Sequence, residues 1–222
     1  MNSIGQPTIK QEMADLCQGF DALGISYNKE IIQKFQKYIE VLYEYRKKLH
    51  LLSNQDYKRI AKKHFLTALM AFRYLKDHQV VCDIGAGAGF PSVPLKIVRQ
   101  NIELTLFESV KKKAEFLSYL KRELGISDIE VINERAEHYR EKKFDIILLK
   151  AVGRIKKLMN VIDHLMVPDG VAIFYKTHQV ENEIKAADKE LIKKGFKIQI
   201  DKLRTPVERL PLALVIVRRR RR

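Results

Sequence analysis

The sequence predicts an α/β fold, in which a seven-stranded, mostly parallel sheet follows an N-terminal helical extension. From Gln79 onward, short apolar runs alternate with amphipathic segments, which is typical of a parallel sheet covered on both faces. The first quarter of the chain has helical periodicity instead. A glycine-rich turn follows the first apolar run. We expect a helical extension over residues 1–76, a sheet domain over 77–217 and a basic tail over 218–222.

Composition narrows the class of protein. The chain has 222 residues, 46% of them hydrophobic, which is enough to bury a core and excludes wholesale disorder. Two cysteines, Cys17 and Cys82, are too few for a disulfide scaffold or a four-ligand zinc site, so no metal is expected. The N-terminus lacks signal-peptide features, and the longest apolar run, Leu210 to Val217, is too short to span a membrane. These features predict a soluble, cytoplasmic protein, which we expect to be a monomer.

The helical extension carries much of the positive charge. Asn28 is a suitable N-cap for a helix whose apolar residues include Ile31 and Phe35, and a second helical stretch is expected from about Ile60 to Leu75. Residues 29–63 carry ten Lys or Arg against four acids, and the whole chain has a net charge of +15. This surplus favours a nucleic-acid partner over a merely solvated basic face.

The sheet domain divides into strands and helices in order. Apolar runs predict strands at 79–85, 102–108, 128–134, 143–149 and 170–176. Amphipathic segments predict helices at 93–99, 111–124, 154–166 and 181–194, of which the second and the fourth are followed by Gly125 and Gly195. Two last strands, near 196–203 and 212–217, are joined by a short connection, so we expect the last strand to run antiparallel.

The strongest chemical signal is the turn DIGAGAGFP, which begins at Asp83. Gly85, Gly87 and Gly89 let the backbone turn sharply and approach a ligand that a Cβ would block. In open α/β sheets, ligands bind beyond the carboxyl ends of the strands. Glu108 ends the next strand, where an acid can accept both hydroxyls of a ribose. Together these residues indicate recognition of an adenosine nucleoside, although a glycine-rich turn without a ligand is the simpler alternative.

The spacing of the loop favours S-adenosylmethionine over a dinucleotide. Dinucleotide binding requires G-x-G-x-x-G, but Phe90 occupies the third glycine's place. Pro91 and Pro94 lack the N–H groups that would bind a pyrophosphate. S-adenosylmethionine has no phosphate, and Asp83 suits a cationic ligand. A nucleotide-dependent oxidoreductase is therefore disfavoured.

The remaining residues narrow the choice of atom to which S-adenosylmethionine would transfer its methyl group. Methyl transfer is a displacement, which positioning and desolvation can promote. Cys82 lies inside a predicted buried strand, which argues against a cysteine-dependent attack on a pyrimidine. Residues 149–152, LKAV, lack the Asn/Asp-Pro-Pro-aromatic turn typical of amine methylation. Lys176 is suitably placed for ribose methylation, but Asp145 is at the wrong end of its strand. A ring nitrogen with a free lone pair, such as guanine N7, requires no general base.

Several motifs resemble one family. The run DIGAGAGFPSVPLKIV (83–98) is similar to the glycine–proline loop of the bacterial 16S ribosomal RNA guanine-N7 methyltransferases, also called the glucose-inhibited division protein B family. The resemblance covers about residues 30–217 and implies a Rossmann-like class I methyltransferase. It includes LHLLS (49–53), Lys63-His64, Glu108-Ser109 with Lys111-Lys112, and Arg135-Ala136-Glu137.

The resemblance implies roles for particular residues. Gly85 and Phe90 would line the methionine pocket, Glu108 would bind the ribose, and Ala136 and Glu137 would border the adenine. The predicted cofactor-binding set is Asp83, Gly85, Gly87, Gly89, Phe90, Glu108, Ala136, Glu137 and Lys150. Lys150 and His64 are the candidate catalytic residues. The predicted RNA-binding residues are Lys62, Lys63, Lys111, Lys112, Lys176, Arg218, Arg219 and Arg220.

The chain also departs from the family pattern. Thr67-Ala68 stands where the family has Asp-Ser, and Lys150 stands where it has Arg, whose planar fork Lys does not reproduce. The closing Glu-Arg-His is eroded, with Arg209-Leu210-Pro211 nearby. The leading hypothesis is methylation of guanine N7 in small-subunit ribosomal RNA, free or within the subunit. A methyltransferase with another RNA target, or a non-enzymatic RNA-binding or assembly protein on the same fold, stays an alternative.

Overall fold

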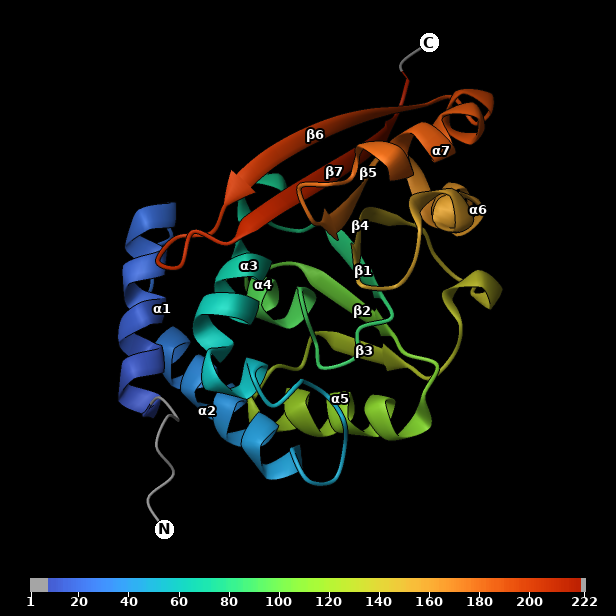
Figure 1. The fold of residues 1–222 in the computed structure, drawn as a ribbon. Coiled ribbons are helices and arrows are strands. Elements are labelled where there is room, and N and C mark those ends of the chain that lie inside the picture. Colours follow the sequence, from blue (N-terminus) through green and yellow to red (C-terminus); the bar gives the residue numbers. More distant parts are fainter. Residues whose placement is uncertain (1–7, 221–222) are drawn as a thin grey trace.

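A seven-stranded sheet runs through the protein, of which the computed structural model describes residues 8–220 (Figure 1). The strands are β1 (Val80–Ile84), β2 (Glu103–Phe107), β3 (Ile129–Ile132), β4 (Phe144–Lys150), β5 (Met166–Lys176), β6 (Phe196–Arg204) and β7 (Pro211–Arg219). Their order is β3-β2-β1-β4-β5-β7-β6. The first five are parallel, and β7 is antiparallel to both of its neighbours. The predicted fold class is confirmed.

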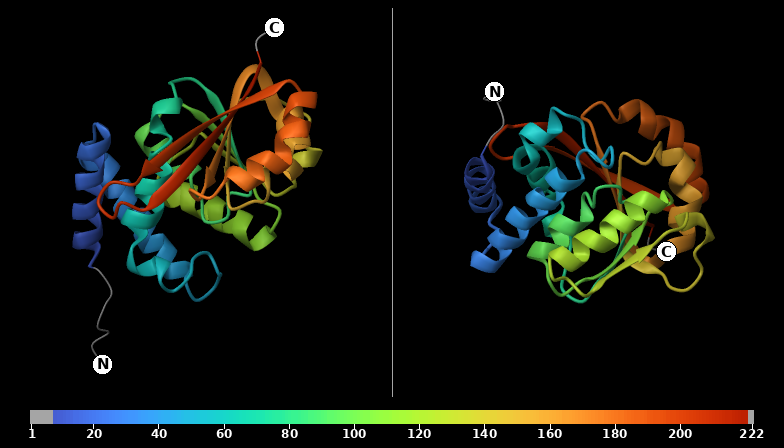
Figure 2. Two further views of the ribbon diagram at one scale, coloured as in Figure 1. Left: turned by 45° about the horizontal axis from the view of Figure 1, so that its top comes forward. Right: turned by 90° about the horizontal axis from the view of Figure 1, so that it is seen from below.

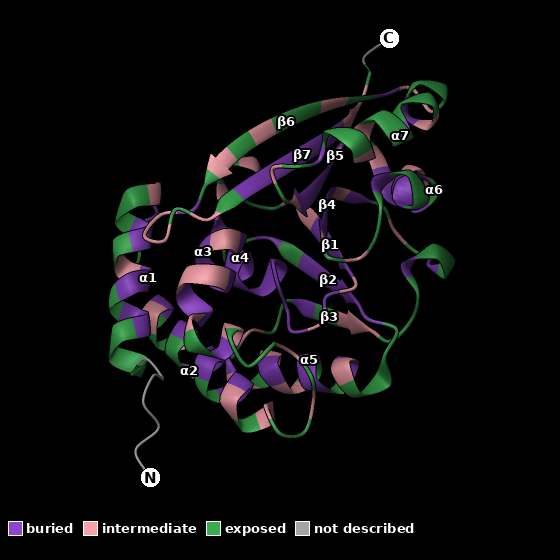
Figure 3. Cartoon of the chain, in the orientation of Figure 1, coloured by how far each residue is buried: buried purple, intermediate pink, exposed green. Residues whose placement is uncertain are grey.

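Helices cover both faces of the sheet (Figure 2). They are α1 (Ile9–Leu23), α2 (Lys29–Tyr45), α3 (Leu66–Leu69), α4 (Ser92–Val98), α5 (Lys111–Glu123), α6 (Ile155–Leu165) and α7 (Glu181–Lys193). Successive strand residues point to opposite faces. Leu104 and Leu106 accordingly belong to the cluster packed by α1–α5, while Cys82 and Phe107 belong to the cluster packed by α6 and α7. The interiors of β1, β2, β4 and β7 are buried, whereas β6 is mostly exposed (Figure 3).

The helical extension packs on the sheet rather than standing apart from it. The Asn28 side chain accepts a hydrogen bond from the Ile31 amide at 2.9 Å, so the predicted N-cap of α2 is confirmed. Phe35 and Ile39 of α2 are fully buried in the same cluster as the sheet residues. The extension therefore shares its core with the domain that follows it.

The second predicted helix is not continuous. Residues 60–75 form a π-helix (Ala61–Phe65), the short α3 and a 3₁₀ turn (Phe72–Tyr74). The prediction of one helix was wrong because apolar spacing alone does not distinguish α-helical turns from wider or tighter ones. Side chains from α1 hold the π-helix, as described below.

Two strands are longer than predicted. β5 begins at Met166, and β7 continues past Val217 to Arg219. Arg218 pairs with Val171 and Arg219 pairs with Phe196. These two arginines belong to the sheet and not to a tail; Arg221 and Arg222 lie outside the described residues. No helix within residues 8–220 is long and apolar enough to cross a membrane.

Candidate functional site

The glycine loop leaves β1 through three residues with positive φ. Gly85, Gly87 and Gly89 have φ values of 72°, 55° and 91°, a region that side chains disfavour. A Cβ on Gly85 would lie 2.2 Å from Val152, and one on Gly89 would lie 2.5 Å from the Tyr38 hydroxyl. A Cβ on Gly87 would meet only the Gly85 carbonyl oxygen, at 3.8 Å. The outer glycines therefore allow close packing, whereas Gly87 faces open space.

Glu108 supports the loop from the end of β2. Its Oε2 accepts a hydrogen bond from the Gly87 amide at 3.0 Å, and its Oε1 accepts one from the Val110 amide at 2.8 Å. The side chain is buried. Each carboxylate oxygen can accept more than one hydrogen bond, so a bound ribose hydroxyl can share these oxygens. Glu108 thus lies directly against the glycine that faces open space.

A pocket of about 580 Å³ opens at the carboxyl ends of β1 and β4. Residues 85–88 and Phe90 line one side of it, and residues 50–53, Asp56 and His64 line another. Lys113, Lys150 and Ala151 complete the lining. This is the edge of a parallel sheet where ligands bind in such folds. The pocket combines the glycine loop with a segment of the helical extension.

Asp83 is fully buried beneath the loop. Its Oδ2 accepts a hydrogen bond from the Ser92 hydroxyl at 2.6 Å, whereas its Oδ1 has no partner among the described residues. Burial raises the pKa of this carboxyl to about 7, against the hydrogen bonds from Ser92 and the charge of Lys150. A cationic group near the loop would restore the ionised form. An unpartnered buried carboxylate oxygen is consistent with a ligand that carries positive charge.

His64 and Lys150 meet in the pocket wall. The Lys150 Nζ lies 3.5 Å from His64 Nδ1, and His64 Nε2 lies 3.6 Å from an oxygen of Asp56. Burial, and then the charge of Lys150, lower the pKa of His64 to about 3. Burial also lowers the pKa of Lys150 to about 8, although Asp83 and Asp56 oppose this. At neutral pH the pair is therefore a neutral imidazole beside an ammonium group.

Phe90 is the aromatic centre of this wall. Its ring stacks on His64 with centroids 4.9 Å apart and on Tyr38 with centroids 5.4 Å apart. The Lys150 ammonium lies 5.3 Å from the Phe90 centroid, within range of a cation–π contact. Three distant parts of the chain therefore fix one another at the pocket.

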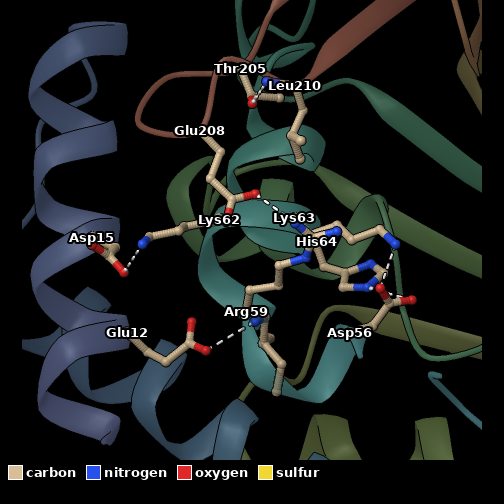
Figure 4. A network of polar contacts seen from close by, with 11 residues as sticks. Glu12, Asp15, Asp56, Arg59, Lys62, Lys63, His64, Thr205, Glu208 and Leu210 are labelled. Atoms are coloured by element: carbon tan, nitrogen blue, oxygen red, sulfur yellow. Dashed lines mark hydrogen bonds and ion pairs between the residues drawn. The ribbon is translucent and has the colours of Figure 1, made fainter. Parts of the chain in front are cut away.

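Side chains of α1 and α2 hold both sides of the pocket. The Glu12 carboxylate accepts hydrogen bonds from the Ile60 amide at 3.0 Å and the Ala61 amide at 2.6 Å, so it caps the helix that carries His64 (Figure 4). Burial raises the pKa of Glu12, while these amides oppose the shift. On the other side, the buried Tyr38 hydroxyl donates to the Ala88 carbonyl at 2.6 Å.

Comparison with known proteins identifies the family. The model of the family described as rRNA small subunit methyltransferase G matches residues 31–210. The chain is 36% identical over 187 residues to the ribosomal RNA small subunit methyltransferase G of Carboxydothermus hydrogenoformans, covering 81% of this chain and 79% of that protein. The chain belongs to the rRNA small subunit methyltransferase G family.

Another member of this family and a solved structure are also similar to the chain. The methyltransferase G of Halalkalibacterium halodurans is 32% identical over 218 residues, which is 95% of this chain and 92% of that protein. Among solved structures, a SAM-dependent O-methyltransferase of Thermotoga maritima superimposes with a TM-score of 0.58 at 16% identity, over 83% of this chain and 72% of that one. This second likeness concerns the fold, a Rossmann-like class I methyltransferase.

The structure gathers some of the predicted cofactor residues and not others. Gly85, Gly87, Phe90 and Lys150 line the methyltransferase G pocket. Gly89, Asp83 and Glu108 lie behind that lining, where they support it. Within the 3₁₀ turn Ala136–His138, Ala136 is buried and Glu137 is exposed. The pocket lining does not include this turn, and its contact with an adenine stays a prediction.

The predicted RNA-binding cations fall into two groups. Lys62 and Lys63 form ion pairs with Asp15 and Asp56, and Lys176 donates to Glu183 and to the Gly153 carbonyl. Arg219 is bound to Asp163. Within residues 8–220, by contrast, Lys111, Lys112, Arg218 and Arg220 form no ion pair with an acid. These cations are available to phosphates without the loss of an ion pair.

Sequence reasoning missed the residues that hold the pocket together. Neither Glu12 nor Tyr38 belongs to a sequence motif that predicts a site. Tyr38 is fully buried. Ser53 and Asp56 line the pocket, and only the resemblance at 49–53 pointed toward this segment. Lys113, next to the predicted Lys111 and Lys112, also lines it.

Proposed function

We propose that this protein transfers the methyl group of S-adenosylmethionine to N7 of a guanine in small-subunit (16S) ribosomal RNA. The observation that carries the proposal is the open side of Gly87 against the Glu108 carboxylate, at the carboxyl edge of the sheet. Membership of the rRNA small subunit methyltransferase G family supports it. The cytoplasmic location and the monomeric state stay predictions.

The residues around the glycine loop suit S-adenosylmethionine, which supplies an electrophilic methyl group on a sulfonium centre. The backbone at Gly87 permits a close approach, because the space that a Cβ would occupy there is open to the pocket. Glu108 accepts hydrogen bonds from ribose hydroxyls while it keeps the Gly87 amide. Asp83 supplies negative charge beneath the loop. In this proposal, Ala136 and Glu137 border the adenine.

The other wall suits a neutral base with a free lone pair. With its pKa lowered to about 3, His64 stays uncharged at neutral pH and puts no positive charge beside the lone pair of N7. Lys150 is charged below about pH 8 and donates to a guanine O6, the acceptor that Lys commonly binds. The role of these residues is to position and desolvate the guanine, because N7 needs no base to remove a proton.

The first test is chemical. Purified protein is incubated with labelled S-adenosylmethionine and 16S ribosomal RNA that lacks its native modifications, and the product nucleosides are separated. We expect a single labelled N7-methylguanosine, which a strain lacking this protein should also lose from its ribosomal RNA. Binding of both ligands without any methylated product would instead support the non-enzymatic alternative. Label on another nucleoside would support a different target.

The second test concerns the cofactor. Glu108→Ala should weaken S-adenosylmethionine binding by about 1–3 kcal/mol, the range for losing hydrogen bonds to a charged group. An analogue without ribose hydroxyls should lose little further affinity for this variant, because the partner is already gone. Calorimetry measures the affinities of the parent and of Glu108→Ala for S-adenosylmethionine and for the analogue. Additive losses would contradict a contact between Glu108 and the ribose.

A further inference from the structure

The end of β7 lies at the opposite edge of the sheet from the methyltransferase pocket. Because β7 is antiparallel to β5, Arg218 pairs with Val171 in the middle of β5, whereas Lys150 of the pocket pairs with Tyr175 near its end. The four residues from Val171 to Tyr175 correspond to about 13 Å along β5, and the two strand spacings from β4 to β7 add about 10 Å sideways. Arg218 is therefore well separated from Lys150. In Figure 1 this end of β7 lies beside α7, while its beginning approaches α1.

A second pocket of about 380 Å³ lies at that edge. Pro168, Asp169, Gly170, Lys197, Arg218 and Arg219 line it, so three of the four charged residues in the lining are cations. The strand register places Lys197 directly opposite Arg218. Like charges opposite each other in an antiparallel pair are destabilising. An anion bound between them would remove that repulsion.

The charges of this pocket are available to a ligand. Within the described part of the chain, neither Lys197 nor Arg218 forms an ion pair with an acid; Arg218 donates only to the Gln199 amide oxygen, at 3.2 Å. Both residues are adjacent to anchored positions. Arg219, next to Arg218, binds Asp163 at 2.8 Å, and the carbonyl of Phe196, next to Lys197, accepts a hydrogen bond from Arg220 Nε at 3.2 Å. The anchors fix the end of β7 and hold the two unpaired cations in place.

We propose that this distal basic pocket (Lys197, Arg218 and Arg219, with 168–170) binds backbone phosphates of the substrate RNA at a distance from the methylated guanine. The inference rests on the proposed function, which supplies the RNA. Phosphate contacts fix the position of a nucleic acid without reading a base. The distal pocket therefore increases affinity for long RNA and sets its orientation, while the pocket at the other edge carries out the chemistry.

The test compares two double variants on two RNAs. Lys197→Ala with Arg218→Ala removes the distal charges, and Lys185→Ala with Lys189→Ala removes two exposed cations of α7 that form no ion pair within residues 8–220, as a matched control. Binding to whole 16S ribosomal RNA, free of protein, is measured between 50 and 200 mM salt. Each lost phosphate contact reduces the slope of log affinity against log salt by about 0.7–0.9.

For the distal variant we expect a slope that is shallower by about 1.4–1.8. The factor by which this variant binds RNA more weakly than the parent should therefore be about tenfold smaller at 200 mM salt than at 50 mM. The control should lose much less. Methylation of a short hairpin containing only the target guanine should be unchanged for both variants. The free energy of unfolding should not fall for the distal variant, because its repulsion is removed.

Two results would overturn the inference. They are an unchanged slope for whole 16S ribosomal RNA, and a loss of hairpin methylation by the distal variant. If the parent protein methylates neither RNA but the slope difference persists, the proposed function fails and the distal pocket stands. If methylation is normal and the slope is unchanged, the distal pocket fails alone.

Discussion

The two walls of the methyltransferase pocket are built in different ways. The loop wall, residues 85–90, is a local backbone structure in which positive φ angles at glycines shape the turn. The arm wall, residues 50–65, is held by side chains that come from far along the chain, with Glu12 reaching across 48 residues to the Ile60 amide. The first wall depends mainly on the residues that occupy it, with one remote support from the Tyr38 hydroxyl to the Ala88 carbonyl. The second depends on what packs against it.

This difference predicts different responses to substitution. A change in the loop wall should remove ligand binding with little effect on the rest of the protein, because in the proposed function the loop's own backbone contacts the ligand. A change in the supports of the arm wall should act on stability and activity together, because the contact is also part of the fold. Four variants separate these behaviours.

Gly87→Val should have the largest effect and abolish S-adenosylmethionine binding. Its branched side chain would fill the open side of the loop and strain a residue with φ of 55°. Gly125→Val is the matched control, because Gly125 has φ of 61° and no atom within 4 Å of an added Cβ. Calorimetry should show binding lost in the first variant and kept in the second, with similar losses of stability. Equal affinity of Gly87→Val and the parent would exclude the loop as the cofactor site.

Glu12→Ala should destabilise the arm wall by about 2–4 kcal/mol, because two buried amide donors, at Ile60 and Ala61, lose their acceptor. Methylation should decline at saturating cofactor, since the helix that carries His64 loosens. Glu30→Ala serves as the control, because it removes only an exposed ion pair to Lys34. Urea unfolding and hydrogen exchange at Ile60 and Ala61 provide the measurements. An unaltered exchange rate at these two amides would contradict the capping role.

Asp83→Asn should raise the free energy of unfolding at pH 7.5 by about 1–3 kcal/mol. Burial raises the folded-state pKa of Asp83 to about 7, well above its ordinary value. The stability contributed by the protonated form is therefore complete below about pH 4 and lost as the pH rises toward 7. Asparagine should flatten this dependence, so the two proteins should differ less at pH 4.5 than at pH 7.5. Urea unfolding at pH 4.5 and pH 7.5 measures this difference in stability.

The same Asp83→Asn variant should bind S-adenosylmethionine more weakly than the parent, because the negative charge beneath the loop is gone. Asp188→Asn, on the exposed side of α7, is the control for handling and net charge. A variant that gains stability and keeps its full affinity would show that the buried carboxyl does not serve the ligand.

Tyr38→Phe should have the smallest effect, about 0.5–1.5 kcal/mol, since it removes one hydrogen bond to the Ala88 carbonyl. Because this bond ties the arm to the loop wall, we expect a higher KM for S-adenosylmethionine with little change in kcat. Tyr43→Phe removes a hydroxyl bond of the same length to the Tyr57 carbonyl, away from the loop. Steady-state kinetics should distinguish the two variants. The same KM for both would mean that Tyr38 has no particular effect on the loop.

The sequence predicted the loop wall well and the arm wall poorly. The positions of Gly85, Gly87 and Glu108 followed from local spacing, and the structure places the three beside one another. The prediction of one helix over residues 60–75 was wrong. Hydrophobic periodicity reports which side of a segment is buried, but it does not report that an acid of α1 binds two of its amides.

By itself, the sequence determined the α/β class, the reversed last strand and the glycine loop, because these depend on local periodicity and on the backbone freedom of glycine. Only the tertiary structure decided which charges are free. Lys62 and Arg218 both lie beside other cations in the sequence, yet Lys62 is paired with Asp15 of α1 while Arg218 lies opposite Lys197 at the far edge of the sheet. Ion pairing depends on distances between residues remote in the chain, and local sequence does not fix those distances.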